Sequence, residues 1–116
     1  MSIKSFAAKI FAKNIHQKTQ AWANNPVETQ QKVFRELISE AQKTTFGKDH
    51  HFAEIKTFED FAKQVPIRDY EELRPYVDRM VKGEENILWK GKPIYFAKTS
   101  GTTSGAKYIP LTKESM

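Results

Sequence analysis

A short run rich in glycine and hydroxyl side chains, with an apolar segment on each side, constrains this chain more than any other feature. The run spans residues 99–107, TSGTTSGAK, and contains two glycines, five serines or threonines and a final lysine. Residues 94–97 (IYFA) before it and 108–111 (YIPL) after it have the composition of short strands. The pattern therefore predicts two strands joined by a loop whose glycines permit positive φ angles and a close approach to a ligand.

The chemistry of this loop favours phosphate binding. Backbone N–H groups in glycine-rich turns form anion-binding concavities, and serine and threonine hydroxyl groups add donors. Lys107 adds a compact positive charge at the end of the loop. The alternative is a solvated turn that is rich in small residues for local conformational reasons. The candidate phosphate-binding residues are Thr99, Ser100, Gly101, Thr102, Thr103, Ser104 and Gly105.

The spacing excludes the two commonest nucleotide-binding loops. A Walker A loop has four residues between its glycines and a Lys-Ser/Thr pair directly after the second glycine. Here three residues separate Gly101 from Gly105, and Ala106 precedes Lys107. No Gly-x-Gly-x-x-Gly fingerprint occurs either. A phosphotransferase that uses this loop to bind ATP is therefore a disfavoured alternative. Detection of AMP rather than ADP as the product would exclude it.

The amino-terminal segment, residues 1–22, predicts one amphipathic helix over residues 3–22. Its apolar residues recur at helical spacing and its lysines are expected on much of the other face. A helix of this kind either docks its apolar stripe on the body of the protein or binds an anionic membrane or a partner. The apolar residues are Ile3, Phe6, Ala7, Ile10, Phe11 and Ile15, and the lysines are Lys4, Lys9, Lys13 and Lys18.

Three further helices are expected before the strands. The first begins at Pro26 behind an Asn25 cap and stops at Gly47. The second begins at Thr57 and ends before Pro66. The third begins behind Asp69 and ends near Gly83, and Pro75 in its first turns leaves its start open. Residues 84–93 form a connection, and residues 112–115 resemble the start of another helix.

Most other charged side chains have structural interpretations. Acidic residues between 69 and 85 fit helix caps, and we prefer ion pairs to substrate contacts for Arg68, Arg74 and Arg79. The adjacent His50 and His51 are expected on the surface or in a turn, because neighbours on an extended chain point in opposite directions and make a poor metal pair. The tyrosines and tryptophans are interpreted as core or interface aromatics.

Composition restricts the class of protein. The net charge of +5 is concentrated in the first twenty residues, which hold four lysines and no acid, so a uniform nucleic-acid-binding surface is not indicated. The chain has no cysteine, which excludes a disulfide framework and a thiolate metal site and fits a cytoplasmic protein. No stretch is apolar over the length of a membrane span.

The loop and the blocks around it resemble a known family. The loop is similar to the phosphate-binding loop of adenylate-forming enzymes, although Ser104 stands where a glycine commonly follows the threonine pair. The flanks resemble the auxin-responsive promoter family of acyl-acid amido synthetases, a branch of the firefly-luciferase-like superfamily. This resemblance covers roughly residues 26–116. The matching blocks are residues 65–73 (VPIRDYEEL), 75–79 (PYVDR), 83–84 (GE), 93–96 (PIYF) and 107–112 (KYIPLT).

The resemblance implies an α/β fold. A mainly helical amino-terminal portion would lead into the first strands of the adenylate-forming large domain, with the strand–loop–strand at residues 93–111. Residues 1–116 would be an incomplete part of that domain, without its remainder and without the carboxy-terminal lid domain, and are not expected to catalyse alone.

The resemblance also implies a reaction. A carboxylic acid would be activated by ATP, with Mg²⁺, as an acyl-adenylate and then transferred to an amine, commonly that of an amino acid. By position, Ser100, Thr102 and Thr103 would donate hydroxyl hydrogen bonds, while Gly101 and Gly105 would allow backbone N–H contacts. Lys107 would be the catalytic or anchoring cation. The alternatives are an acyl-coenzyme A ligase and a non-enzymatic binding module, and the oligomeric state stays open.

Overall fold

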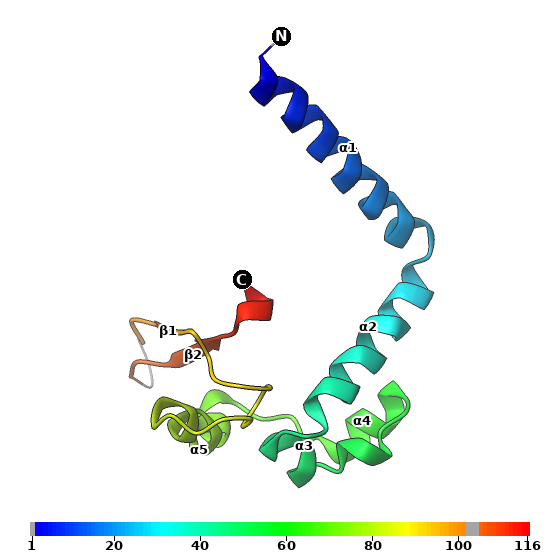
Figure 1. Ribbon diagram of the computed structural model, residues 1–116. Helices are drawn as coiled ribbons and strands as arrows, with labels where there is room; N and C mark the ends of the chain where they lie inside the picture. Colours follow the sequence, from blue (N-terminus) through cyan, green and yellow to red (C-terminus); the bar gives the residue numbers. More distant parts are fainter. Residues whose placement is uncertain (1, 102–104) are drawn as a thin grey trace. The chain divides into compact units, whose positions relative to one another are not determined.

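The computed structural model describes residues 2–101 and 105–116 (Figure 1). The chain divides into two compact units, Met1–Phe34 and Arg35–Met116, and each is described by itself. Five α-helices precede two short strands in the described residues. The predicted order, a mainly helical portion that leads into strands, is confirmed.

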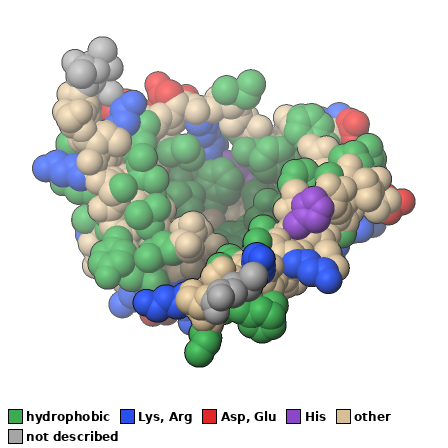
Figure 2. All heavy atoms as spheres, turned by 90° about the horizontal axis from the view of Figure 1, so that it is seen from above, with side chains coloured by type: hydrophobic (Ala, Val, Ile, Leu, Met, Phe, Trp, Pro, Cys, Tyr) green, Lys and Arg blue, Asp and Glu red, His purple; other side chains and the backbone are tan. Residues whose placement is uncertain are grey.

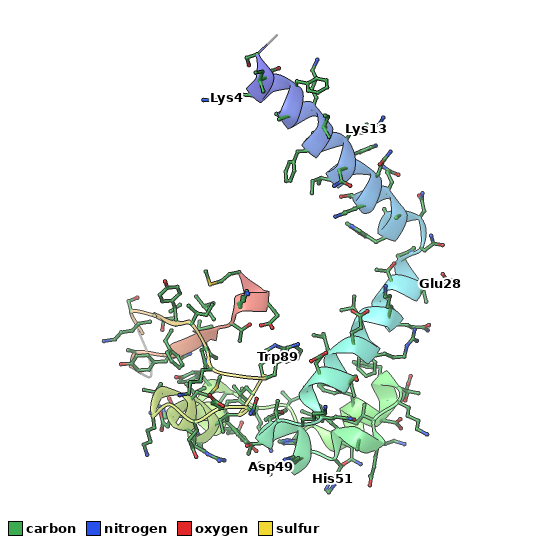
Figure 3. The ribbon with its side chains drawn as sticks, in the orientation of Figure 1. Lys4, Lys13, Glu28, Asp49, His51 and Trp89 are labelled. Carbon is green, nitrogen blue, oxygen red and sulfur yellow. The ribbon has the colours of Figure 1, made fainter. Side chains whose placement is uncertain are left out.

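Helix α1 (Ile3–Asn24) is the principal element of the first unit, and none of its residues is buried. The hydroxyl of Ser2 caps it by accepting the backbone N–H of Ser5 at 3.2 Å. The expectation that its lysines share one face is wrong. Lys4 and Lys13 are nine residues apart, which is half a revolution more than two full turns, so they extend from opposite sides of the helix (Figure 3).

Helix α2 (Pro26–Ala41) begins at the predicted proline. Its carboxy-terminal part belongs to the second unit, where Ile38 and Ala41 are buried. The side chain of Asn25 has a different role from the predicted cap of α2, because its amide donates to the carbonyl of Ala21 at the end of α1.

The prediction that Gly47 ends this helix is wrong. Helix α2 ends at Ala41, and Gly47 lies inside the short helix α3 (Thr45–Asp49). A Cβ atom at Gly47 would lie 2.1 Å from the carbonyl oxygen of Ala41. Glycine is needed here for close backbone packing between consecutive helices, and a chain stop was the wrong interpretation of it. Thr44 completes this corner, since its hydroxyl donates to Ala41 O at 2.6 Å and accepts from Gly47 N at 3.0 Å.

The core of the second unit combines residues from α2, α5, the 3₁₀ turn at Phe52–Glu54 and the connection 84–93. Ile87, from this connection, is only 2% exposed. The connection is held by α3, whose first N–H groups donate to the carbonyls of Asn86 and Ile87 at 2.8 and 3.0 Å. The buried apolar residues are Ile38, Ala41, Phe52, Ile55, Val77, Met80 and Ile87.

An aromatic cluster centred on Phe46 includes one of the two histidines, which both lie in a turn as predicted. His50 is buried, stacks on Phe46 with 4.0 Å between ring centroids and has its Nδ1 2.7 Å from the Phe46 carbonyl oxygen. Tyr76 and Phe52 meet Phe46 edge-on. His51 is exposed, as predicted, and adopts the left-handed conformation at φ 54°.

Helices α4 (Phe58–Gln64) and α5 (Tyr70–Val81) begin where the sequence places them. Each has a capping box, formed by Thr57 with Asp60 and by Asp69 with Glu72. Pro75 lies inside α5 and does not delay its start. The capping box satisfies the backbone N–H groups of Asp69 and Glu72, which stabilises the helix despite the missing N–H of the proline.

Strands β1 (Tyr95–Lys98) and β2 (Tyr108–Leu111) form an antiparallel pair, within one residue of the predicted bounds. Tyr95 pairs with Leu111 and Lys98 with Tyr108. The pair lies beside α5 (Figure 1). A 3₁₀ turn at Lys113–Ser115 follows, at the predicted helix start. Figure 2 shows that hydrophobic side chains remain on the surface among lysines and arginines, and Ile94, Tyr95 and Ile109 are exposed.

Candidate functional site

The base of the glycine-rich loop is closed by two hydrogen bonds between Thr99 and Lys107. The backbone N–H of Thr99 donates to the Lys107 carbonyl at 2.9 Å, and the backbone N–H of Lys107 donates to Thr99 Oγ1 at 3.1 Å. These bonds extend the β1–β2 ladder by one step beyond the Lys98–Tyr108 pair. Thr99 therefore has a structural role in the loop, and Lys107 is fixed at its end.

The two glycines of the loop adopt backbone conformations that other residues rarely adopt. Both have positive φ angles, 53° at Gly101 and 79° at Gly105. A Cβ atom on Gly101 would lie 1.8 Å from the carbonyl oxygen of Gly105, whereas one on Gly105 would meet nothing within 4 Å. The backbone thus turns back on itself so tightly that only glycine fits at Gly101.

The described part of the loop places several predicted residues at this turn. Ser100 and Gly105 are exposed, while Gly101 and Lys107 are partly exposed. Thr102, Thr103 and Ser104 lie outside the described residues, so the prediction that they bind phosphate stays a prediction. The same holds for the phosphate-binding role of the whole loop.

Tyr70, the first residue of α5, contacts the end of this loop. Its phenolic oxygen accepts the backbone N–H of Tyr108 at 2.8 Å and donates to the carbonyl of Tyr108 at 3.4 Å. The sequence indicates only a core or interface aromatic at Tyr70. No local signal identifies its partner, because 38 residues separate the two positions.

Several cationic groups lie near these aromatic rings. Lys107 Nζ is 5.8 Å and the Arg74 guanidinium carbon 5.6 Å from the centroid of the Tyr70 ring, and Lys98 Nζ is 6.0 Å from that of Tyr108. These separations are within the range of cation–π attraction. Because Arg74 is also paired with Glu71, the two lysines supply the positive charge at the end of the loop, where an anionic ligand would be stabilised.

The preferred ion-pair interpretation is confirmed for two arginines. Arg74 pairs with Glu71 at 3.1 Å, and Arg79 pairs with Glu84 at 2.7 Å. The hydrogen bond from Arg79 lowers the pKa of Glu84, and the same bond raises the pKa of Arg79. Arg68 lies 6.0 Å from the Phe46 ring. Exposed pairs of this kind contribute little stability in water.

Tyr76 is the aromatic residue whose acidity changes most clearly. Burial raises its pKa, and its hydrogen bond to the Asp49 carboxylate, 2.8 Å long, raises the pKa further. Its hydroxyl bonds to the α3 region, away from the loop, so its role is structural. Within residues 2–101 and 105–116, no group of three or more histidine or acidic side chains could hold a metal ion. No described helix is both long and apolar enough to cross a bilayer.

Comparison with protein families places this chain in a recognised class of protein. Residues 15–116 match the N-terminal domain of the GH3 family, and the chain belongs to this family. The predicted family resemblance is confirmed, and the family match begins within α1.

Named relatives in plants are similar to this chain. Indole-3-acetic acid-amido synthetase GH3.15 of Arabidopsis thaliana is 33% identical over 94 residues, which cover 79% of this chain and 16% of the relative. The 4-substituted benzoates-glutamate ligase GH3.12 of the same species is 44% identical over 48 residues, 40% of this chain and 8% of the relative. The chain thus spans about one sixth of the length of such relatives.

Proposed function

We propose that the full-length protein is an ATP-dependent acyl-acid amido synthetase and that residues 99–107 contact the phosphates of ATP. The observation that carries the proposal is the tight glycine turn of Gly101 and Gly105 in a chain of the GH3 family. Relatives named as amido synthetases and as a glutamate ligase support a carboxylic acid and an amino acid as the substrate classes.

The geometry of the loop suits an anion. Positive φ angles at both glycines turn the backbone so that N–H groups can converge, as in other anion-binding turns. The exposed hydroxyl of Ser100 and the ammonium of Lys107 add a donor and a charge on the same turn. Donors that are already in position stabilise developing negative charge without reorganisation, which is the main source of catalysis in phosphoryl-type transfers.

The proposed reaction has two steps. In the first, a carboxylate oxygen of the acid attacks the α-phosphorus of ATP, the bond to the β-phosphate oxygen breaks, and pyrophosphate leaves with the electron pair. In the second, an amine attacks the acyl carbon, AMP leaves, and the amine loses a proton. The loop would act in the first step, since negative charge then moves onto the leaving pyrophosphate next to its donors.

The Mg²⁺ that the family resemblance implies has no ligand set among the described residues. Among them no group of three or more histidine or acidic side chains could hold a metal ion, and Asp69, Glu72 and Glu84 are already engaged in a cap or an ion pair. We therefore derive no step through the metal from this segment.

ATP–pyrophosphate exchange in the full-length protein, with a panel of aryl and indolyl acids, tests the proposal. We expect exchange that depends on the acid, and release of AMP when an amino acid is added. Ser100→Ala or Thr103→Ala should slow exchange by about 10- to 1,000-fold, as expected for loss of a transition-state donor. Ser39→Ala, on the exposed surface of α2, is the matched control.

Two results would contradict the proposal. Wild-type exchange in the Ser100 and Thr103 variants would remove the loop from the reaction. Formation of ADP, or of a coenzyme A thioester in place of an amide, would assign the protein to a phosphotransferase or an acyl-coenzyme A ligase.

A further inference from the structure

We propose that Tyr70 is a positioning residue for ATP: through its hydroxyl group and ring it holds the end of the glycine-rich loop and the ammonium of Lys107. This inference rests on the proposed function and extends it to a residue of a different element. Tyr70 belongs to α5, whereas Lys107 and Tyr108 belong to the end of the loop and the start of β2.

The hydroxyl of Tyr70 bonds to both polar groups of one backbone residue. Tyr108 is the strand partner of Lys98. The hydrogen bonds at the next step of the ladder connect Thr99 with Lys107, so the N–H and C=O of Tyr108 face away from β1. Tyr70 Oη accepts from this N–H at 2.8 Å and donates to this C=O at 3.4 Å. The Tyr70 hydroxyl thus forms the two hydrogen bonds that a neighbouring strand would otherwise make with Tyr108.

The start of α5 holds the phenol in position. Tyr70 follows the N-cap Asp69, whose side chain accepts the backbone N–H of Glu72 at 3.0 Å. The Glu72 carboxylate in turn accepts the backbone N–H of Asp69 at 2.9 Å. This reciprocal box determines where the helix begins and therefore where its first side chain is presented.

The ring of Tyr70 lies within cation–π range of Lys107, the proposed phosphate-binding cation. Lys107 Nζ lies 5.8 Å from the ring centroid, and residue 107 is the immediate neighbour of the backbone that the hydroxyl holds. A lysine on a flexible stem loses rotamer entropy when it binds an anion. A ring that attracts the ammonium, together with a hydroxyl that holds the next residue, restricts this freedom before ATP arrives.

Tyr76 provides a matched control on the same helix. Its hydroxyl also makes a 2.8 Å hydrogen bond, but to the Asp49 carboxylate of α3 and away from the loop. Tyr76→Phe and Tyr70→Phe therefore each remove one hydroxyl group from a half-buried tyrosine of α5 and leave its ring in place. Only the second should affect ATP.

The test measures steady-state kinetics of the full-length protein with Tyr70→Phe, Tyr76→Phe, Lys107→Ala and the Tyr70→Phe/Lys107→Ala double variant. Loss of a hydrogen bond should raise KM for ATP by about 3- to 10-fold in Tyr70→Phe, with KM for the amino acid unchanged. Tyr76→Phe should leave both KM values unchanged. Because Tyr70 acts through Lys107, the double variant should be no worse than Lys107→Ala alone.

Hydrogen exchange of α5 checks that each variant is folded. A Tyr70→Phe protein with wild-type KM for ATP overturns the inference, as does an additive double variant or an equal rise of KM in Tyr76→Phe. The proposed function fails by a different result, namely the absence of acid-dependent ATP–pyrophosphate exchange in the wild-type protein.

Discussion

Helix α1 and the core around Ile87 contain the same kinds of apolar side chain, but they differ completely in burial. Ile3 and Phe11 of α1 are 88% and 68% exposed, and no residue of this helix is buried. Ile87 has no regular secondary structure around it, yet it is 2% exposed. Helical periodicity thus predicted the helix correctly, whereas burial depended on contacts that periodicity does not encode.

The two regions also differ in how the backbone is held. Helix α1 relies on its own ladder and on the Ser2 cap. The segment around Ile87 is held by hydrogen bonds from α3 and by Asn86, whose side chain accepts the backbone N–H of Gly91 at 2.6 Å. A regular helix satisfies its own polar groups, while an irregular buried segment needs partners from other elements.

Truncation of a core side chain should have the largest effect. Ile87→Ala should lower the free energy of opening of the second unit by about 2–5 kcal/mol, because a buried isoleucine leaves a cavity. Ile3→Ala in α1 should change the opening free energy by less than about 0.5 kcal/mol. Amide hydrogen exchange with mass spectrometry in the full-length protein measures both locally. Equal effects of the two substitutions would abolish the contrast between core and helix.

A methyl group at the α2–α3 corner should have the next largest effect. Gly47→Ala should destabilise residues 44–50 by about 2–3 kcal/mol, since the new Cβ would lie 2.1 Å from the Ala41 carbonyl oxygen. Gly83→Ala is the control, because Gly83 has φ 96° and open space around it, so only the backbone strain of about 1–2 kcal/mol applies. Unchanged hydrogen exchange in Gly47→Ala would show that the α2–α3 corner accommodates the methyl group without a loss of stability.

Removal of a helix cap should have a smaller effect. Asp69→Ala should destabilise α5 by about 1 kcal/mol, because the capping box with Glu72 is lost. Ser2→Ala removes the simple cap of α1 and should increase exchange only in the first turn of that helix. The comparison tests whether a cap in a packed unit stabilises more than the first turn of its helix. Faster exchange of the Asp69→Ala protein at residues 70–72 alone would show that the cap acts only on that turn.

The smallest effect should depend on pH. Hydrogen bonds from the backbone N–H of Lys56, and then of Thr57, lower the pKa of Asp60 in the folded protein. A carboxyl group whose folded pKa is lowered stabilises the fold above its unfolded value, about 4, and this contribution is lost as the pH falls through the lowered folded pKa.

Asp60→Asn should therefore weaken the decline of melting temperature with acid between about pH 5 and pH 2, relative to Glu59→Gln in the same helical turn. The measurement is a series of thermal melts of the full-length protein across this range. An identical slope in both variants would contradict the assignment to Asp60.

Local chemistry made much of the architecture predictable. The Thr57 and Asp69 caps, Pro26 at the start of α2 and the two strands around the glycine-rich run all correspond to interactions within a few residues. The incorrect prediction for Gly47 has a physical cause. Gly47 has the composition of a helix stop, but its role is decided by close packing against the Ala41 carbonyl. The sequence also does not indicate that the turn residue His50 is buried against Phe46.

For the candidate site, the loop residues were predicted from the sequence, but the contact between Tyr70 and the end of the loop was not. The glycine-rich loop, its glycines and Lys107 follow from composition and family resemblance. That Tyr70 binds the backbone of Tyr108 across 38 residues could not be predicted, because no periodic pattern links a helix start to a strand start.

Sequence alone determined the starts of α1, α2, α4 and α5, the two strands and the glycine-rich turn, because capping, strand propensity and positive φ act over a few residues. Only the tertiary structure decided that Ile87 and His50 are buried, that Gly47 faces a carbonyl and that Tyr70 holds the loop. The burial of Ile87 and the contact of Tyr70 depend on which distant segments meet, and that free energy comes from contacts that no short stretch of sequence contains. The roles of Gly47 and His50 depend on how closely the chain packs at the corner between α2 and α3, which local propensity does not encode.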